Sequence, residues 1–300
     1  MQTPVPGIEW IAVDWGTTHL RAWAVQGGTV LARAQSDDGM GRLGRDGFEP
    51  ALSRLVGGWA AGPVTVVACG MVGSRQGWTE APYVAVPCPP LPQGLTRAPT
   101  TLPDLNVHII PGLKQTAPAD VMRGEETQIA GFLALNPGWD GVLCHPGTHC
   151  KWAHVSAGEV VSFQTFMTGE LFATLAGQTV LRHSVAASGW DEDGFAQGLD
   201  EGFSRPERLA ARFFALRAEA LLNDLSPQVA RARLSGLLIG AELAAAKPYW
   251  LGQNVAVIGE GAVAGLYVRA LAAHSVHATQ AVGEAVTLAG LTAAWRRLKG

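Results

Sequence analysis

Three short apolar runs, divided by turn residues, open the chain. They span residues 9–14, 20–25 and 30–34, with Gly and Thr between the first two and a Gly-Gly pair between the second and third. Runs of this length bounded by glycine-containing turns predict β-strands, and a Gly-Gly pair is a frequent hairpin turn. We therefore expect three consecutive strands without a crossover helix between them.

The rest of the chain alternates between helical periodicity and short apolar runs. Apolar positions three or four residues apart predict helices over residues 46–60, 120–135, 169–183, 206–223, 228–246, 262–273 and 284–298. Candidates for buried strands lie at 64–68, 107–110, 141–144, from 153 onward, 160–166 and 254–258. Residues 79–104 are rich in Pro and turn residues, so we expect an extended loop there. The mixture indicates an α/β protein.

One pattern of strand, turn and strand occurs twice. The turn at residues 14–18 lies between two predicted strands, and a second Gly-Thr turn at 145–149 lies between two more. The repeat predicts two domains of related construction, each offering a turn to one ligand. A cluster of Pro and Gly near residues 111–120 places the boundary there. We expect domains at 1–118 and 119–300, with the last helix (284–298) able to pack back on the first domain.

Composition and charge narrow the class of protein. The chain has 300 residues, 48% hydrophobic and 16% charged, with a net charge of −3. It can bury two domain cores, and its weak negative charge argues against nucleic-acid binding, which needs a basic surface. The four cysteines form no CxxC pair, so we expect no zinc site and a reduced, cytoplasmic protein. No apolar run has the length of a membrane span, and residues 1–10 lack the pattern of a signal peptide.

The first turn carries the residues of a phosphate and metal site. Gly16 allows the backbone to approach a ligand closely, while the hydroxyls and amides of Thr17 and Thr18 can bind phosphate oxygens. Asp14 ends a buried strand, where a carboxylate is costly unless a charged group meets it. A hydrated Mg²⁺ beside nucleotide phosphates fits this position. The alternative is a plain hairpin whose polar side chains satisfy the turn amides.

Two later turns add candidate nucleotide contacts. Gly147 and Thr148 can close on further phosphate oxygens, and Lys151 is a candidate phosphate cation or, equally, a solvated edge residue. Gly259 and Gly261 lie between a predicted strand and helix, where glycines permit close approach of a base or ribose and the helix N-terminus favours polar ligand atoms. The chain has neither the dinucleotide GxGxxG pattern nor a GxxxxGK[ST] loop.

Two adjacent carboxylates open the helix predicted at residues 120–135. A kinase needs a carboxylate to accept the proton of the acceptor hydroxyl, and Glu125 and Glu126 are the main candidates, with Asp120 behind them. Acidic residues also favour helix N-termini through the helix dipole, which is the alternative explanation. Arg123 can pair with one of these carboxylates or with an acidic substrate.

A glycine-rich loop at residues 70–78 suits a sugar acid. Arg pairs with a carboxylate, Ser and Gln bind hydroxyls, and Trp covers the C–H face of a sugar. The candidate residues here are Gly73, Ser74, Arg75, Gln76 and Trp78. The alternative is an ordinary loop whose Trp packs in the core.

The order of these motifs resembles that of the superfamily containing sugar kinases, hexokinase, Hsp70 and actin. In those proteins a DxGTT turn and a second Gly-Thr turn grip phosphates from opposite domains, and a late glycine-rich turn holds adenosine. The resemblance implies an α/β fold with two ribonuclease H-like domains of the actin and hexokinase type, whose mixed β-sheets flank a central cleft. Residues 124–132 also resemble the Gly-Asp-Gln-Gln-Ala-Ala catalytic helix of glycerol- and xylulose-type kinases. Glu125 then occupies the place of the catalytic Asp, a departure that leaves the base open between Glu125 and Glu126.

Longer segments are similar to the 2-dehydro-3-deoxygalactonokinase family. These are residues 14–23, 70–83, 122–128, 145–152 and 166–170. The resemblance implies phosphorylation, by Mg-ATP, of the 6-hydroxyl of 2-dehydro-3-deoxy-D-galactonate in galactonate catabolism. The late turn departs from the family's double Gly, because Glu260 separates its two glycines.

The resemblance also implies roles for the candidate residues. Asp14 holds Mg²⁺, and the glycines and threonines of the turns bind ATP. The sugar-acid carboxylate falls to Arg75, Arg21 or Arg123, since a guanidinium can pair with it bidentately. One alternative is a kinase of the same fold acting on another sugar or sugar acid; another is an actin- or Hsp70-like ATPase that switches with a protein partner. We expect no nucleic-acid or membrane partner, and a homodimer is left open.

Overall fold

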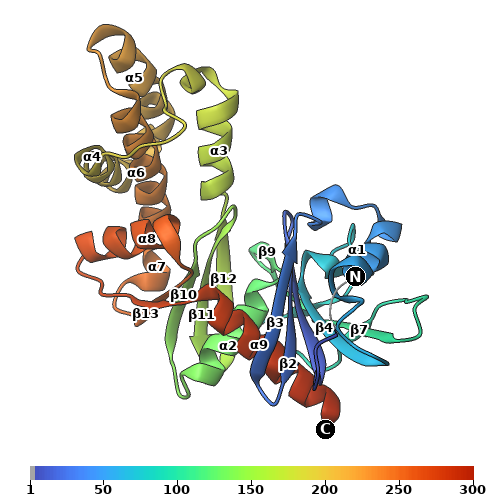
Figure 1. Ribbon diagram of the computed structural model, residues 1–300. Helices are drawn as coiled ribbons and strands as arrows, with labels where there is room; N and C mark the ends of the chain where they lie inside the picture. The colour runs from blue at the N-terminus through green and yellow to red at the C-terminus, as the bar shows by residue number, and fades with distance from the viewer. Residues whose placement is uncertain (1–3) are drawn as a thin grey trace. The chain divides into compact units, whose positions relative to one another are not determined.

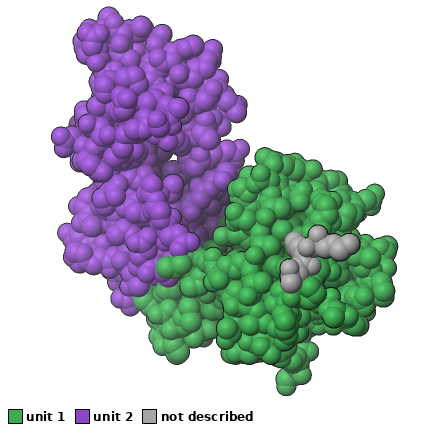
Figure 2. Space-filling model, viewed as in Figure 1, with its two compact units in different colours: residues 1–140, 155–162, 282–300 green, residues 141–154, 163–281 purple. Residues whose placement is uncertain are grey.

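The computed structural model describes residues 4–300, which divide into two compact units (Figure 2). Unit 1 comprises the chain up to Asp140 together with Val155–Ser162 and Val282–Gly300, and unit 2 comprises Gly141–His154 and Phe163–Ala281. Residues 1–3, part of the stretch considered above for a signal peptide, lie outside the described residues. Residues 119–140 and the last helix lie in unit 1, so residues on both sides of the expected boundary at 118 and 119 belong to one unit.

Unit 1 is built on a six-stranded mixed sheet with helices on its two faces (Figure 1). Its strands, in the spatial order β3-β2-β1-β4-β7-β6, are β1 (Trp10–Trp15), β2 (Leu20–Gln26), β3 (Thr29–Ser36), β4 (Val64–Gly70), β6 (Thr96–Arg97) and β7 (Leu105–Ile109). Its helices are α1 (Phe48–Val56), α2 (Glu125–Leu135) and α9 (Gly283–Lys299). The three consecutive strands predicted at the start of the chain are present, and β1 pairs antiparallel with β2 and parallel with β4.

Strand β1 is buried on both faces of this sheet. Val13 and Trp15 belong to the core under α1, whereas Trp10 and Ala12 belong to the core under α9. The ring of Trp10 stacks on that of Trp295 in α9, with ring centroids 5.1 Å apart. Burial on both faces explains why β1 has a continuous apolar run instead of alternation. The polar Asp14 lies near the end of this strand, just before the chain turns.

A smaller sheet in unit 1 corrects two sequence-based expectations. It consists of β5 (Tyr83–Ala85), β8 (Gly112–Thr116) and β9 (Ala119–Met122). The segment expected to be loop over residues 79–104 contains two short strands. β5 pairs with β8 in this sheet, and β6 pairs with β7 in the six-stranded sheet. Residues 120–122 are strand, and the predicted helix begins only at Glu125. Gly124 lies between β9 and α2 with a φ of 111°, a conformation that fits neither a strand nor a helix and so separates the two elements.

The second sheet lies mostly in unit 2 and repeats the strand order of the first. Its order is β12-β11-β10-β13-β14, with β10 (Gly141–His145), β11 (Cys150–Ser156), β12 (Glu159–Phe166), β13 (Val255–Ile258) and β14 (Thr279–Ala281). Three consecutive strands are again followed by strands parallel to the first of them. β11 begins at Cys150, before the predicted residue 153, and β14 was not predicted. The shared order agrees with the expectation of two domains of related construction.

The helices of unit 2 include one pair packed backbone to backbone. The helices are α3 (Thr168–Gln178), α4 (Glu192–Ser204), α5 (Leu209–Leu222), α6 (Pro227–Ala245), α7 (Lys247–Trp250) and α8 (Gly261–Ala273). A Cβ added at Gly198 or Gly202 of α4, or at Gly236 or Gly240 of α6, would collide with the backbone of the other helix. Glycine has low helix propensity, which explains why α4 was not predicted. Within residues 4–300, no helix is both long enough and apolar enough to cross a membrane.

Candidate active site

Asp14 lies at the end of β1, in contact with a cation from the neighbouring strand. Arg21 stands opposite Asp14 in the β1–β2 register, and its guanidinium donates to Asp14 Oδ2. On the other side, Cys69 of β4 donates its thiol to Asp14 Oδ1 over 3.8 Å. The carboxylate is thus half-buried yet charge-paired, as a carboxylate at the end of a buried strand needs to be.

The turn that follows Asp14 is held from behind by a glycine. Thr17 and Thr18 are exposed, and the amide of Gly16 donates to the carbonyl of His19 at 3.0 Å. A Cβ added at Gly39 would collide with the backbone of both threonines, so only glycine allows this packing. Sequence reasoning missed Gly39, because nothing in its local pattern relates it to the first turn.

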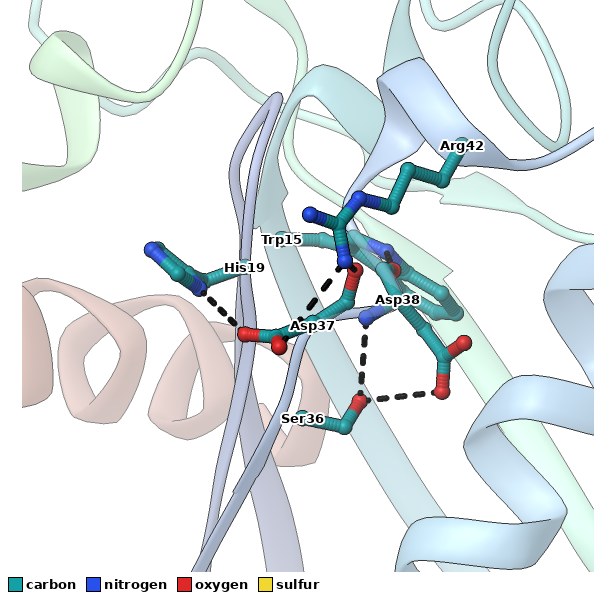
Figure 3. Close-up of polar contacts among 6 residues, drawn as sticks. All are labelled: Trp15, His19, Ser36, Asp37, Asp38 and Arg42. Carbon is teal, nitrogen blue, oxygen red and sulfur yellow. Dashed lines mark hydrogen bonds and ion pairs between the residues drawn. The ribbon is translucent and has the colours of Figure 1, made fainter.

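A cluster of polar side chains flanks the same turn (Figure 3). His19 Nδ1 lies 3.2 Å from Asp37 Oδ1, and Arg42 donates to the backbone carbonyl of Asp37 at 3.3 Å. The indole of Trp15 donates to the carbonyl of Asp38 at 2.8 Å, which fixes the segment after β3 beside the end of β1. None of these contacts was predicted.

The turn in unit 2 has the same construction. Gly147 and Thr148 are exposed, and a Cβ added at Gly169 would collide with the carbonyl of Gly147. The amide of Glu170 donates to the carbonyl of Thr148 at 3.0 Å, and His149 Nε2 lies 2.5 Å from Glu170 Oε2. Each unit therefore presents an exposed threonine turn, supported by a glycine that follows its third strand.

A cavity of about 990 Å³ in unit 2 opens beside this turn. Its lining includes Gly147 and Thr148 of the turn, Gly261 at the start of α8, and Gly265 one turn further along that helix. Gly259 does not line the cavity, although it lies two positions before Gly261. The volume is in the upper part of the range usual for small-ligand sites. The structure thus gathers three of the predicted nucleotide residues around one cavity.

Glu242 of α6 forms a buried polar network under this cavity. It accepts hydrogen bonds from the indole of Trp152 at 2.7 Å, from the hydroxyl of Tyr267 at 2.6 Å and from the hydroxyl of Thr168. Burial raises the pKa of Glu242. Thr168 and Tyr267 also line the cavity, so the network fixes part of its wall. Sequence reasoning missed Glu242, which lies in an otherwise ordinary helical pattern.

Lys151 is buried, which excludes the alternative of a solvated edge residue, while its role as a phosphate cation stays a prediction. It is 5% exposed and lies near His145, whose two ring nitrogens have no hydrogen-bond partner among residues 4–300. Burial, with a contribution from the charge of Lys151, lowers the pKa of His145 to about 3. His145 is therefore a neutral group beneath the turn at neutral pH.

The two glutamates at the start of α2 differ in burial. Glu126 is completely buried; its Oε2 accepts from the amide of Gly124 at 2.6 Å and its Oε1 from the hydroxyl of Thr127 at 3.0 Å. Glu125 is half-buried, and its Oε2 accepts from the amide of Arg123 at 3.1 Å. Burial, and then the charge of Glu125, raises the pKa of Glu126 to about 8. Of the two, Glu125 is the more accessible to solvent.

The start of α2 lies beside the first turn at one edge of the unit 1 sheet. A Cβ added at Gly124 would lie 3.4 Å from the Cα of Gly70, and one added at Gly70 would lie 3.5 Å from Asp14 Oδ1. The thiol of Cys69 has a pKa raised by burial and then by the charges of Asp14 and Glu126. Asp14 and the acidic helix start, far apart in the sequence, therefore share one neighbourhood. Asp120 lies on β9 instead, outside the helix.

The glycine-rich loop divides into buried and exposed residues. Trp78 packs in the core, where its ring stacks on Phe48 with centroids 6.4 Å apart, and its indole donates to the carbonyl of Pro99. Ser74 is 4% exposed. Arg75 and Gln76 are exposed. The structure thus places Trp78 in the core and leaves Arg75 and Gln76 available to a ligand.

Arg123 holds this loop from beneath. Its guanidinium lies 4.2 Å from the ring centroid of Tyr83 and donates to the carbonyl of Ala81 at 2.7 Å. A Cβ added at Gly73 would lie 2.8 Å from Arg123 NH1, so glycine leaves room for the guanidinium. Arg123 is 8% exposed. These contacts give Arg123 a structural role in the loop.

Comparison with known proteins gives matches over nearly the whole chain. The family model described as 2-keto-3-deoxy-galactonokinase matches residues 14–294. A protein of Rhizobium meliloti (strain 1021), named a probable 2-dehydro-3-deoxygalactonokinase, is 38% identical over 301 residues and 96% of each chain. The 2-dehydro-3-deoxygalactonokinase of Escherichia coli (strain K12) is 35% identical over 285 residues, covering 94% of this chain and 96% of the relative.

Solved structures agree on the fold. A Sinorhizobium meliloti crystal structure, named for the same kinase, superposes with a TM-score of 0.86 at 36% identity and covers 96% of both chains. Component A of the (R)-2-hydroxyglutaryl-CoA dehydratase of Acidaminococcus fermentans superposes with a TM-score of 0.55 at 12% identity, over 98% of this chain and 100% of that chain. The second likeness concerns the fold alone. The predicted fold class, α/β with two ribonuclease H-like domains and mixed sheets, is confirmed.

Proposed function

We propose, on the premise that this chain belongs to the 2-keto-3-deoxy-galactonokinase family, that it transfers the γ-phosphoryl group of Mg-ATP to the 6-hydroxyl of 2-dehydro-3-deoxy-D-galactonate. Family membership makes it a kinase of galactonate catabolism. The observation that carries the finer proposal is the meeting of Asp14 with the acidic start of α2 in unit 1. Phosphoryl transfer needs a metal-bound phosphate and a carboxylate base, and this edge of the sheet supplies a carboxylate for each.

Asp14 is the residue proposed to hold the metal. Within residues 4–300 no group of three or more His, Cys, Asp or Glu side chains is arranged to bind a metal ion. A single carboxylate fits Mg²⁺, which keeps several waters and takes its other ligands from the substrate phosphates. When bound, Mg²⁺ neutralises charge on the phosphate oxygens. Arg21 donates to Asp14 Oδ2 and so fixes the orientation of the carboxylate that would hold the metal.

Glu125 is the proposed general base. A base must be able to reach the acceptor hydroxyl and must be ionised at the working pH. The pKa of Glu126 is raised to about 8, so it is largely protonated at neutral pH, and its oxygens are occupied by Gly124 and Thr127. Glu125 is partly exposed at the same helix start.

Arg75 is the proposed partner of the sugar-acid carboxylate. Of the three arginines considered, Arg21 is paired with Asp14, and Arg123 is buried against Tyr83. Arg75 is exposed on the loop that follows β4. Its guanidinium has no hydrogen-bond acceptor or carboxylate partner among residues 4–300. Gln76, beside it, is available to hydroxyl groups of the substrate.

The cavity of unit 2 is the proposed adenosine site. Its lining includes the apolar Leu238 and Ile239 of α6 together with Gly147 and Thr148 of the turn. The exposed amides and hydroxyl of that turn suit phosphate oxygens. The turn of Thr17 and Thr18 in unit 1 is of the same construction, and we assign it to phosphate as well.

A substrate panel with an ADP-release assay tests the proposal. We expect turnover with 2-dehydro-3-deoxy-D-galactonate that depends on both ATP and Mg²⁺, and formation of a 6-phosphate identified by NMR. Activity on neutral ketoses, with none on 2-keto-3-deoxy acids, would instead assign another sugar substrate. ATP hydrolysis that needs no acceptor would contradict the kinase assignment.

A further inference from the structure

Both threonine turns end in a histidine that is held by a carboxylate. In unit 1 the ring of His19, directly after the turn, contacts Asp37 through Nδ1 at 3.2 Å, as Figure 3 shows. In unit 2 the ring of His149, directly after its turn, contacts Glu170 through Nε2 at 2.5 Å. The two carboxylates come from different places in their segments. Asp37 lies before the supporting glycine of its unit, and Glu170 lies after the equivalent glycine.

The same pairing therefore recurs although the residues that make it do not correspond in position. Stability alone does not explain why the histidine–carboxylate pair recurs, because an exposed ion pair contributes about 0–1 kcal/mol to the free energy of unfolding. The side chains of His19 and His149 are 65% and 49% exposed. In each ring only one nitrogen contacts the carboxylate. Among residues 4–300, the second nitrogen has no hydrogen-bond or ion-pair partner in the protein. What the two pairs share is a free imidazole nitrogen beside a phosphate-type turn.

The carboxylate-bearing segments are bonded directly to the turns. The amide of Gly41 donates to the carbonyl of Thr17 at 2.9 Å, and the amide of Glu170 donates to the carbonyl of Thr148 at 3.0 Å. Thr148 also lines the cavity of unit 2. The histidine, its carboxylate and the turn are thus one hydrogen-bonded assembly in each unit. A ligand on the turn has an oriented imidazole next to it.

We infer that His149 in unit 2 and, independently, His19 in unit 1 are phosphate ligands, each donating from its free ring nitrogen to a phosphoryl oxygen held at the threonine turn of its own unit. Asp37 and Glu170 are positioning residues that fix the rotamer of the rings. In the bound complex each ring contacts its carboxylate through one nitrogen and the phosphoryl oxygen through the other. The inference rests on the proposed use of ATP, and it adds His19 and His149 to the proposed phosphate contacts.

Replacement of each histidine by alanine tests the inference. We expect His149→Ala and His19→Ala each to raise the KM for ATP roughly tenfold, as loss of a hydrogen bond to a charged group would. The KM for the sugar acid and the binding of adenosine, measured by calorimetry, are expected to stay within about twofold. His277→Ala is the matched control, since this histidine is exposed in unit 2 and does not line the cavity. Unchanged KM values for ATP in both variants would overturn the inference.

Amide substitutions distinguish a ligand from a structural histidine. The amide nitrogen of Asn can replace Nδ1, and that of Gln can replace Nε2. The free nitrogen is Nδ1 in His149 and Nε2 in His19. We therefore expect His149→Asn to retain more ATP affinity than His149→Gln, and His19→Gln to retain more than His19→Asn. A histidine that acts only through its carboxylate contact predicts the opposite order at each position, because Gln would then replace Nε2 of His149 and Asn would replace Nδ1 of His19. That opposite order, or the same order at both positions, would contradict the inference.

A double-mutant cycle tests the positioning role of Glu170. Glu170→Gln is expected to weaken ATP binding several-fold in the parent protein and to have no further effect in the His149→Ala background. Affinities for a non-hydrolysable ATP analogue and for adenosine give this readout without the sugar acid. If the parent protein fails to phosphorylate the sugar acid, the proposed function fails, whereas a selective loss of affinity for the analogue still supports the inference. Equal effects of Glu170→Gln in both backgrounds would overturn it.

Discussion

At the residue scale, neighbouring side chains of one type have separate tasks. Glu125 and Glu126 are consecutive, yet one is half-buried and the other has no exposed surface. Burial raises the pKa of Glu126, and two local donors occupy its oxygens. It closes the start of α2, where the first amides of a helix need acceptors. The more accessible neighbour, Glu125, is the one proposed as the general base.

Separate substitutions of the two glutamates test this division. We expect Glu125→Gln to lower kcat by roughly two to four orders of magnitude, the usual contribution of a general base. Glu126→Gln is expected to keep most of the turnover, because the amide oxygen can still accept from the amide of Gly124 while the amide nitrogen donates to the hydroxyl of Thr127. Steady-state kinetics on the sugar acid measures both. If both variants keep near-wild-type turnover, neither glutamate is the base.

The raised pKa of Glu126 predicts a pH dependence of stability. Its pKa rises from an ordinary 4.5 to about 8, so between these values the folded protein binds more protons at this site than the unfolded chain does. The free energy of unfolding therefore falls as pH rises through this window, by up to about 1.4 kcal/mol per pH unit from this site alone. Denaturant unfolding of the parent protein and of Glu126→Gln from pH 5 to 8 measures the difference. An identical pH slope in the two proteins would contradict the assignment.

At the element scale, glycines decide how closely segments approach. Gly39 and Gly169 allow the two threonine turns to rest on the segment after the third strand of each sheet. Four further glycines allow α4 and α6 to touch through their backbones. At these positions even a methyl group overlaps neighbouring backbone atoms, which cannot move as a flexible side chain can. The closest contacts between backbone segments of this chain therefore depend on glycine, which has no side chain.

The α4–α6 contact gives a prediction with an internal control. Gly240→Ala places a Cβ against the backbone of Leu199 and Phe203, so we expect a loss of about 1–3 kcal/mol in the free energy of unfolding. Gly177→Ala in α3 is the control, since nothing lies within 4 Å of its added Cβ. There the helix propensity of Ala predicts no loss, or a gain of up to about 1 kcal/mol. Thermal or denaturant unfolding measures both, and equal effects would contradict the packing argument.

At the scale of the whole molecule, one strand order is used twice for different purposes. Both sheets begin with three consecutive strands, and the turn proposed to bind phosphate follows the first of them. Unit 1 adds carboxylates around its turn, through Asp14 and α2. Unit 2 adds a cavity between its turn and α8. The same framework is thereby suited to acid–base and metal chemistry in one unit and to a large ligand in the other.

Variants in the two units should therefore separate chemistry from nucleotide binding. Asp14→Asn is expected to lower kcat at least a hundredfold, since it removes the proposed metal ligand, while adenosine still binds. Gly265→Leu is expected to block adenosine, because this position lines the cavity and leucine would extend into it. Isothermal calorimetry and the ADP-release assay distinguish the two effects. Loss of adenosine binding in Asp14→Asn would contradict the division.

Residue types and their local spacing were sufficient for the three opening strands and for most of the helices. These features depend on neighbours in the chain, so a short window contains them. The second sheet's order, the β9 strand at residues 119–122 and the support of each turn by Gly39 or Gly169 depend on partners far away in the sequence. Burial is likewise a property of the assembled core. Only the tertiary structure could place Trp78 in that core, raise the pKa of Glu126, keep Glu125 half-buried and expose Arg75, because desolvation and packing are decided by residues distant along the chain.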